Sequence, residues 1–362
     1  MAKKINVAIL FGGRSAEHDI SLRSAKNVIK SIDKTKYNLV FIGIDKKGNW
    51  LQFDTQQKLD EIAKKDELNL KGAMGQLALQ LGAQGVFSSS NGAQQLAVDV
   101  AFPVLHGPFG EDGSVQGLLK LANIPFVGPS LLGSAAGMDK DVMKRLLRDA
   151  GLPISEYVCL RVGEEVPDFK YFNEKLGMPC FVKPANLGSS VGISKARNEE
   201  ELLKAIETAF QFDKKIIIEK YIKGREIECA ILGNADAKAS VTGEVIAHHD
   251  FYSFDSKYID DQGSETKIPA DLSDEKQDEI RAMALKTFKV LECEGLSRVD
   301  IFLQENGELV VNEINTIPGF TSISMYPMLW KESGIEYAEL IDELIVLAFE
   351  RFEIESKFKV EV

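Results

Sequence analysis

The sequence predicts an α/β fold that begins with a doubly wound unit around a parallel sheet. Residues 5–11 form a continuous apolar run, typical of a buried parallel strand, and a pair of glycines then turns the chain. Helical periodicity follows over residues 17–32, and residues 37–45 and 98–107 give two more strands. Because strands and helices alternate, the α/β class is favoured. The 362 residues are enough for two or three domains.

Composition and charge narrow the class of protein. The formal net charge is −12, whereas a general nucleic-acid or membrane-surface binder needs an excess of Lys and Arg. No apolar run approaches the ~18–20 residues of a membrane span, and the apolar run near the N-terminus is too short for a signal peptide. We therefore expect no nucleic-acid or membrane partner. The scattered cysteines, without a CxxC pair, indicate reduced thiols in a cytoplasmic protein: Cys159, Cys180, Cys229 and Cys293.

The remaining elements are predicted from periodicity and turn residues. Residues 50–98 are polar and rich in Gly and Gln, and they give no functional signal. Residues 248–270 are polar and aromatic, and they are long for a simple connection, so a functional loop is expected there. The other predicted elements are a helix and strand (131–160), a strand, Ser/Gly loop, strand and helix (175–210), two strands (215–232), an amphipathic helix (274–292) and a final helix (337–352).

A β-hairpin is predicted after the amphipathic helix. Residues 297–304 and 308–315 both show the apolar alternation of half-buried strands. Between them lies Asn306-Gly307, the strongest short signal for a two-residue turn, because both residues tolerate positive φ.

Four polar side chains project from one face of this hairpin if the Asn-Gly pair forms its turn. Asp300 then lies opposite Glu313, and Arg298 lies opposite Asn315. Two carboxylates that face each other across a ladder repel, and a cation between them relieves the repulsion. Oxygen ligands favour a hard cation, Mg2+ or Mn2+, over zinc. The alternative is a face that is simply solvated.

A Ser/Gly loop at residues 188–192, GSSVG, is a candidate anion site. Its glycines leave room for backbone amides to turn toward an anion, two hydroxyls add donors, and Lys183 adds charge. This suits nucleotide phosphates, although the loop is not a P-loop. Glu219, on a later strand, is placed to accept a hydrogen bond from an adenine amino group. The alternatives are an ordinary turn, solvated lysines at Lys140 and Lys183, and a glutamate exposed to water.

Several longer motifs follow one another in a fixed order. They are FGGRSAEHDIS (11–21), HGPFGEDGSVQG (106–117), MDK (138–140), FVKPANLGSSVG (181–192), IEKYIKGREIE (218–228), FYSFDSKY (251–258), RVD (298–300) and NEINTIPGFTSIS (312–324). In this order they resemble the ATP-grasp superfamily and, within it, the D-alanine–D-alanine ligases. The resemblance spans nearly the whole chain apart from residues 50–98, and the ordered set is far more specific than any one motif.

The resemblance implies a three-domain ATP-grasp fold that clamps ATP between its second and third domains. The domains are expected at residues 1–130, 131–223 and 224–362, with a lid loop at about residues 246–268. Two Mg2+ (or Mn2+) ions that carry the β- and γ-phosphates are expected at Asp300, Glu313 and Asn315. The residues expected to bind ATP are Lys140, Lys183, Ser190, Glu219, Tyr221, Ile222, Glu226, Lys257 and Asn312.

The resemblance also implies where the two amino acids bind. Glu17 corresponds to the residue that binds the ammonium group of the first D-alanine, and Met325 falls where leucine is common. Ser189 and Tyr258 are expected to form a hydrogen-bonded triad with Glu17. The expected catalytic residues are Glu17, Ser189, Tyr258, Arg298 and Gly319, and the expected substrate-binding residues are Glu17, His106, Arg298, Gly319, Ser324 and Met325. Of these, Arg298 and the Gly319 backbone hold the oxyanion.

The implied reaction joins two D-alanines at the expense of ATP. Phosphoryl transfer to the first D-alanine makes an acyl phosphate, which the amine of the second D-alanine attacks. The base for that amine stays open between Tyr258, acting through Ser189, and the departing phosphate. A tyrosine at position 258 is typical of dipeptide-forming ligases, whereas D-alanyl-D-lactate ligases often carry phenylalanine there.

The expected protein is therefore a cytoplasmic ligase that supplies peptidoglycan precursors, with D-alanine and ATP as its small-molecule partners and, as is usual in the family, a homodimer. Three alternatives remain: a D-alanine–D-lactate ligase, another ATP-grasp amino-acid ligase, and a catalytically silent nucleotide-binding sensor.

Overall fold

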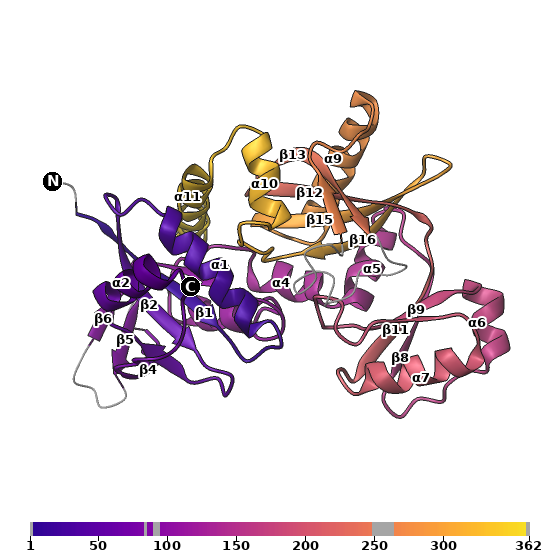
Figure 1. The fold of residues 1–362 in the computed structure, drawn as a ribbon, viewed down its shortest axis with the longest axis horizontal. Helices are drawn as coiled ribbons and strands as arrows, with labels where there is room; N and C mark the ends of the chain where they lie inside the picture. The colour runs from indigo at the N-terminus through magenta and orange to yellow at the C-terminus, as the bar shows by residue number, and fades with distance from the viewer. Residues whose placement is uncertain (1–2, 83–84, 90–94, 248–263, 360–362) are drawn as a thin grey trace.

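The computed structural model describes residues 3–82, 85–89, 95–247 and 264–359, and this part contains three β-sheets with helices packed against them. In Figure 1 the N-terminal sheet lies at the left, the second sheet at the right and the third sheet above them. The strands of each sheet lie within one of the three residue ranges expected for the domains. Strands β1–β7 lie in the first range, β8–β11 in the second and β12–β16 in the third.

The N-terminal sheet has the strand order β6-β5-β4-β3-β2-β1-β7. Its first strand, β1 (Ile5–Gly12), pairs in parallel with β2 (Tyr37–Ile44) and β7 (Val100–Val104). Helix α1 (His18–Ser31) packs against one face and α3 (Ser114–Leu121) against the other. Both faces of the parallel strands are thus covered, which explains why β1 reads as an unbroken apolar run.

Antiparallel strands within residues 50–98, the range that gave no functional signal, extend this sheet. These strands are β3 (Trp50–Gln52), β4 (Gly75–Leu79), β5 (Val86–Ser89) and β6 (Gln95–Ala97). Helix α2 (Thr55–Lys65) follows β3, and the Asp54 carboxylate caps it by accepting from the Gln57 amide. The parallel order therefore holds only for β2, β1 and β7.

The second sheet, in the order β10-β9-β11-β8, is antiparallel and has helices on one face. Its strands are β8 (Tyr157–Arg161), β9 (Cys180–Pro184), β10 (Ser194–Ala196) and β11 (Lys215–Lys220). Helices α6 (Phe169–Leu176) and α7 (Glu199–Phe210) bury one face in an apolar cluster. The alternate residues of β9 and β11 remain on the other face, where they line a cavity.

The third sheet, in the order β14-β13-β12-β15-β16, joins the N-terminal unit through the last helix. Its strands are β12 (Gly224–Gly233), β13 (Lys238–Ala247), β14 (Ser264–Lys267), β15 (Gly295–Gln304) and β16 (Leu309–Asn315). Helix α9 (Asp274–Val290) covers one face. Helices α10 (Met325–Glu332) and α11 (Tyr337–Ser356) cover the other, and their cluster continues into the N-terminal core.

The helix predicted after residue 131 is in fact two helices. Helix α4 (Leu131–Met138) ends at Asp139, whose extended backbone starts α5 (Lys140–Asp149). The Asp139 carboxylate accepts from the amides of Asp141 and Val142, so the break is a capped helix start. It makes Lys140 the first residue of α5.

The hairpin turn also differs from the prediction. The Gln304 amide donates to the Glu308 carbonyl, which leaves a three-residue loop, and only Gly307 has positive φ in that loop. A bulge at Asn312 then shifts the pairing by one residue. As a result Asp300 still pairs with Glu313, and Arg298 still pairs with Asn315. The predicted register of the charged residues is confirmed, although the turn was wrong.

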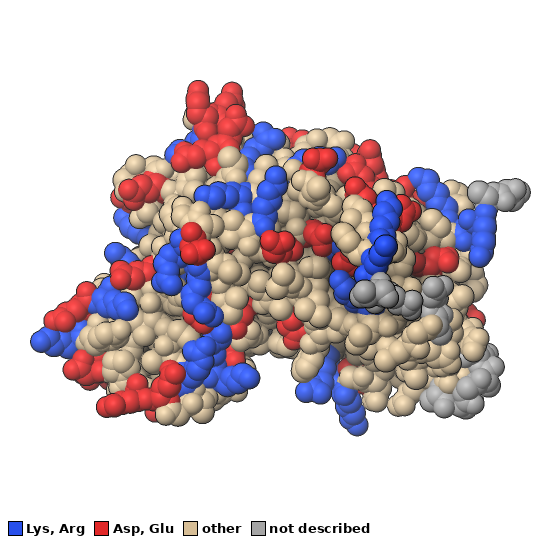
Figure 2. Space-filling model, turned by 180° about the vertical axis from the view of Figure 1, so that it is seen from behind, with Lys and Arg blue, Asp and Glu red and all other residues tan. Residues whose placement is uncertain are grey.

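Charged side chains of both signs cover the surface that Figure 2 shows, where Lys and Arg are interspersed with Asp and Glu over one face of the molecule. Among the described residues, no helix is both long and apolar enough to cross a membrane. The four cysteines are free thiols.

Candidate active site

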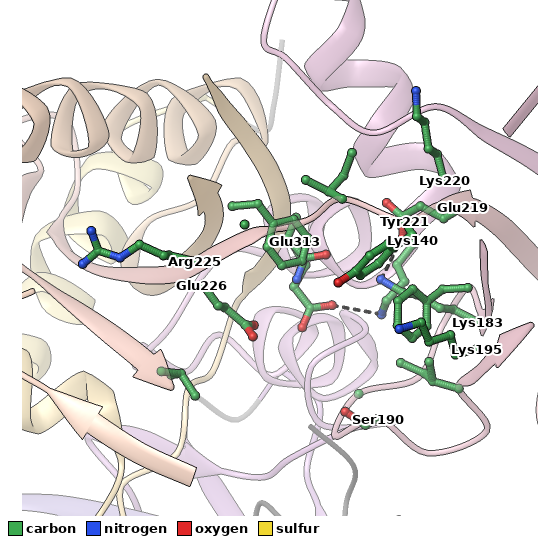
Figure 3. A pocket seen from close by; sticks show the side chains of 18 of the residues that line it. Lys140, Lys183, Ser190, Lys195, Glu219, Lys220, Tyr221, Arg225, Glu226 and Glu313 are labelled. Carbon is green, nitrogen blue, oxygen red and sulfur yellow. Dashed lines mark ion pairs between the residues drawn. The ribbon is translucent and has the colours of Figure 1, made fainter. Parts of the chain in front are cut away.

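A cavity of about 490 Å³ lies between the second and third sheets (Figure 3). Strands β9 and β11 line one side, and β12, β13, β15 and β16 line the other. Its size suits a small-molecule ligand. The predicted ATP-binding residues that it brings together are Lys140, Lys183, Ser190, Glu219, Tyr221, Ile222, Glu226 and Asn312. Lys257 lies outside the described residues.

Glu219 is the most enclosed charge in the cavity wall. Its Oε2 lies 2.8 Å from Lys183 Nζ, and its Oε1 lies 2.5 Å from Lys144 Nζ. The Ser155 hydroxyl donates to the same Oε1. Burial alone would raise the pKa of Glu219, but the two lysines outweigh it and hold that pKa well below its usual value. The side chain is therefore ionised and acts only as a hydrogen-bond acceptor.

Lys140 connects the Ser/Gly loop to the hairpin. Its Nζ donates to the Leu187 carbonyl over 2.8 Å and lies 3.5 Å from Glu313 Oε2. Figure 3 marks this ion pair between Lys140 and Glu313 with a dashed line. Lys215 Nζ bonds Asp139, the cap of α5, and thereby fixes the helix start that carries Lys140.

The Ser/Gly loop carries backbone strain beside the predicted first substrate site. Ser189 and Ser190 have φ of +50° and +59°, values that L-residues adopt at a cost. The Ser189 hydroxyl donates to Glu17 Oε1, as the predicted triad requires, while Tyr258 lies outside the described residues. Gly107 is needed here, because a Cβ on it would lie 2.4 Å from Glu17 Oε2.

Arg298 lies at the centre of the hairpin face. Its Nε and Nη2 donate to the two carboxylate oxygens of Asp300, each over 2.8 Å, and its Nε lies 2.8 Å from Glu228 Oε2. Asn315 Nδ2 donates to Asp300 over 2.9 Å. Burial would lower the pKa of Arg298, but Asp300 and Glu228 outweigh it, so that pKa lies well above its usual value.

The repulsion predicted between Asp300 and Glu313 is therefore already relieved by protein cations. Arg298 neutralises Asp300, and Lys140 lies near Glu313. The sequence predicts a metal ion as the cation between them, and in the structure Arg298 and Lys140 already bring positive charge to these carboxylates.

The donor set still fits a hard divalent cation. No group of three or more His, Cys, Asp or Glu side chains within the described ranges is arranged to hold a metal, and the predicted set contains only two carboxylates with an amide. Asn312 Oδ1, beside Glu313, is buried without a hydrogen-bond partner in the described part of the chain. Mg2+ commonly takes one or two carboxylates and completes its shell with phosphate oxygens and water.

His106 is buried behind Glu17 and held on three sides. Its Nε2 contacts the Ser24 hydroxyl at 3.0 Å, and its Nδ1 lies 3.2 Å from the Ile317 carbonyl and 3.5 Å from Glu111 Oε1. Burial would lower the pKa of His106, but Glu111 outweighs it and raises that pKa. His106 therefore ties the N-terminal unit to the loop after the hairpin.

The predicted site for the second amino acid lies where that loop enters α10. Ser324 precedes α10, and its hydroxyl accepts from the Thr321 amide over 2.9 Å. Gly319 is close enough to Ser324 that a Cβ on it would lie 2.7 Å from the hydroxyl oxygen. The Met325 side chain is buried and packs toward Gly243, so only its backbone is placed to contact a ligand at this loop.

Sequence reasoning missed several residues of the site. Phe181 and Phe302 line the cavity, and each lies two residues from a predicted residue on its strand, so strand alternation could have found them. Lys195 lies 4.5 Å from the Tyr221 ring centre. Lys144 and Glu228 gave no separate signal, because their roles depend on pairing with distant segments.

Comparison with known proteins agrees with this geometry. The family models for the N-terminus and C-terminus of D-ala D-ala ligase match residues 6–129 and 146–346. The chain is 51% identical over 359 residues to a D-alanine–D-alanine ligase of Oceanobacillus iheyensis, with 98% of each chain covered.

Two solved structures show the same fold. The D-alanine–D-alanine ligase from Coxiella burnetii has a TM-score of 0.86 and 37% identity, and the match covers 98% of this chain and 97% of that one. The ligase of that name from Bacillus anthracis, complexed with ATP, has a TM-score of 0.73 and 28% identity, with 97% and 99% covered. The chain has the ATP-grasp fold and belongs to the D-alanine–D-alanine ligase family.

Proposed function

We propose that this protein is an ATP-dependent ligase that joins two D-alanines into D-alanyl-D-alanine through a D-alanyl phosphate. The observation that carries the proposal is the hydrogen bond from Ser189 to Glu17. Ser189 belongs to the loop that lines the nucleotide cavity, and Glu17 is the proposed partner of the first D-alanine ammonium group. The contact supports a γ-phosphate site beside the carboxylate of the first D-alanine, which would receive the phosphoryl group, and proximity is the first requirement of that transfer.

The charged residues of the cavity have separate tasks in this proposal. Lys140 and Lys183 bind the triphosphate, and the hydroxyl and backbone amides of the Ser/Gly loop around Ser190 add hydrogen-bond donors. Glu219 accepts from the adenine amino group, and Glu226 binds the ribose. Arg298 and the Gly319 backbone stabilise the charge that develops at the reacting carboxyl group.

Two divalent cations would be held by Asp300, Glu313 and Asn315, with Mg2+ or Mn2+ favoured by the oxygen donors. When bound, they supply positive charge to the phosphate oxygens. With such a cation at Asp300, Arg298 would still have Glu228 as a partner to orient its guanidinium.

The second amino acid is proposed to bind at Ser324 and at the backbone of Met325 and to attack through its amine.

Water must be kept from the acyl phosphate, and the predicted lid supplies that function. Its ends lie in β13 and β14, which pair with each other, and its middle lies outside the described residues. A cytoplasmic homodimer that supplies peptidoglycan precursors completes the proposal.

The deciding assay is phosphate release from ATP and Mg2+ with one amino acid at a time. D-alanine is expected to stimulate release, whereas L-alanine is not. A rate of phosphate release that does not change with D-alanine contradicts the proposal. No phosphate release with any amino acid favours a nucleotide-binding sensor. If D-lactate outcompeted D-alanine as second substrate at neutral pH, the ligase would be of the depsipeptide-forming type.

A further inference from the structure

Lys144 is a buried lysine that reaches the nucleotide cavity from behind its wall. It lies one turn after Lys140 on α5 and is only 1% exposed. Its Nζ lies 2.5 Å from Glu219 Oε1 and 3.2 Å from Ser155 Oγ. Lys144 is not among the residues that line the cavity, so its ammonium group meets the ligand only through Glu219.

Glu219 is therefore placed between two lysines on opposite sides. Lys183 approaches Oε2 from the cavity side, where it also lines the cavity, and Lys144 approaches Oε1 from the protein interior. The binding role proposed for Lys183 needs its ammonium group at the phosphates. Without another counter-ion, the 3%-exposed Glu219 carboxylate would then retain Lys183 or take up a proton.

We propose that Lys144 is a positioning residue that keeps Glu219 ionised while Lys183 moves to the triphosphate, and that it thereby sets the preference for adenine. The inference rests on the roles proposed above for Lys183 and Glu219. Lys144 stays with Glu219 in both states, held by Ser155 and by the ring of Tyr157, whose centre lies 5.9 Å away. Lys183 is the exchangeable partner of the pair.

The state of Glu219 determines which purine it accepts. An ionised carboxylate only accepts hydrogen bonds, so it matches the 6-amino group of ATP and repels the 6-oxo group of ITP. A protonated carboxyl group also donates, and it tolerates ITP. Loss of Lys144 is therefore expected to reduce the discrimination between the two nucleotides, which the loss of a merely structural lysine would not do.

The experiment compares steady-state kinetics with ATP and with ITP in Lys144→Met. We expect the KM for ATP to rise about tenfold or more, and the ATP/ITP ratio of kcat/KM to fall about tenfold. The kcat at saturating ATP and the KM for D-alanine are expected to stay within about twofold. Lys144→Gln keeps a donor without the charge and is expected to give the same loss, whereas Lys144→Arg keeps the charge and the preference.

Lys58→Met is the matched control. Lys58 is also 1% exposed and pairs with a carboxylate, Glu61, over 2.8 Å, but it lies in the N-terminal unit. It is expected to lower the melting temperature without changing the KM for ATP or the nucleotide preference. This control separates the loss of a buried ion pair from a change in nucleotide recognition.

Glu219→Gln separates this inference from the roles on which it rests. If Glu219→Gln lowers the ATP/ITP ratio while soluble Lys144→Met and Lys144→Gln both keep the wild-type ratio, Glu219 recognises the base and the inference about Lys144 is overturned. If none of the three variants changes the ratio, the role of Glu219 is wrong and the inference fails with it. A lower ratio in Glu219→Gln and in either neutral Lys144 variant supports it.

Discussion

Arg298 holds Asp300 with two parallel hydrogen bonds, each 2.8 Å long, on the face of the hairpin that carries the proposed metal ligands. The same Nε lies 2.8 Å from Glu228 on the neighbouring strand. The planar guanidinium thus joins two buried carboxylates, Asp300 and Glu228. This geometry makes the hairpin face a charged site that is prepared before any ligand arrives.

Arg298→Lys tests that geometry. A lysine keeps the positive charge but cannot form the two parallel bonds, so we expect kcat to fall by about 10²-fold or more. The free energy of unfolding is expected to fall by about 1.5–3 kcal/mol. Coupled ADP release and urea unfolding measure the two effects.

Arg351→Lys is the control for Arg298→Lys. Arg351 is a buried arginine of α11 that donates to the carbonyls of Phe126 and Gly128, away from the hairpin face. It is expected to lose stability without loss of kcat. Equal kcat in wild type and Arg298→Lys would contradict the proposed role of the guanidinium.

Asp139→Ala tests the break between α4 and α5. Loss of the cap is expected to cost about 1 kcal/mol of stability and to raise the KM for ATP several-fold, because Lys140 is the next residue. Asp168→Ala removes the similar cap of α6, which accepts from the Tyr171 amide, and is expected to cost as much stability without changing that KM. Thermal melts and ATP titrations of both variants are the measurements, and an equal KM in the two variants would count against the claim.

Glu111→Gln tests the raised pKa of His106. A group whose pKa is raised by folding contributes stability that is fully present below its unfolded pKa, about 6.5 for histidine, and that is lost as pH rises through the folded pKa. Glu111 is the main cause of the rise, with Glu17 also facing the ring. The wild-type advantage over Glu111→Gln is therefore expected to be larger at low pH than at high pH. Urea unfolding at about pH 5.5 and 8.5 checks this, and an advantage that grows with pH would refute it.

Met325→Leu tests whether the backbone at this position binds the second D-alanine. The side chain packs toward Gly243 in the core, so a swap of similar volume is expected to cost less than about 1.5 kcal/mol. The KM for the second D-alanine is expected to stay within about twofold. A large rise in that KM without loss of stability would show that the thioether itself contacts the substrate.

Local patterns in the sequence predicted the Ser/Gly loop, Lys183 and Glu219, whereas Tyr221, Ile222, Glu226 and Asn312 were implied by the family resemblance. Lys183 and Glu219 lie on the neighbouring strands β9 and β11, and both line the cavity as expected. The predicted pairing of the charged hairpin residues is correct although the turn is not. The turn has one residue more than predicted, and the bulge at Asn312 compensates for it. Neither feature follows from alternation alone, because a bulge depends on how the paired strands twist.

The residues that sequence reasoning missed depend on long-range pairing. Lys144 meets Glu219 only because α5, whose apolar side chains pack in the cluster of the third sheet, also contacts β11 of the second sheet. Glu228 meets Arg298 only because β12 pairs with β15. The ion pairs of Arg298 with Asp300 and of Lys140 with Glu313 were missed for the same reason. The antiparallel strands within residues 50–98 are short, and most residues of β4 and β6 are exposed, so their apolar alternation is too weak to predict strands.

The central claim is that the hairpin face is the catalytic centre, and Glu313→Gln tests it most directly. The change removes one charge and keeps the shape, so we expect kcat to fall by about 10³-fold or more while the melting temperature shifts by less than about 4 °C. Glu308→Gln, at the exposed end of the same hairpin, is expected to keep wild-type activity. Near-normal turnover in Glu313→Gln would contradict the account and would mean that the face is merely solvated.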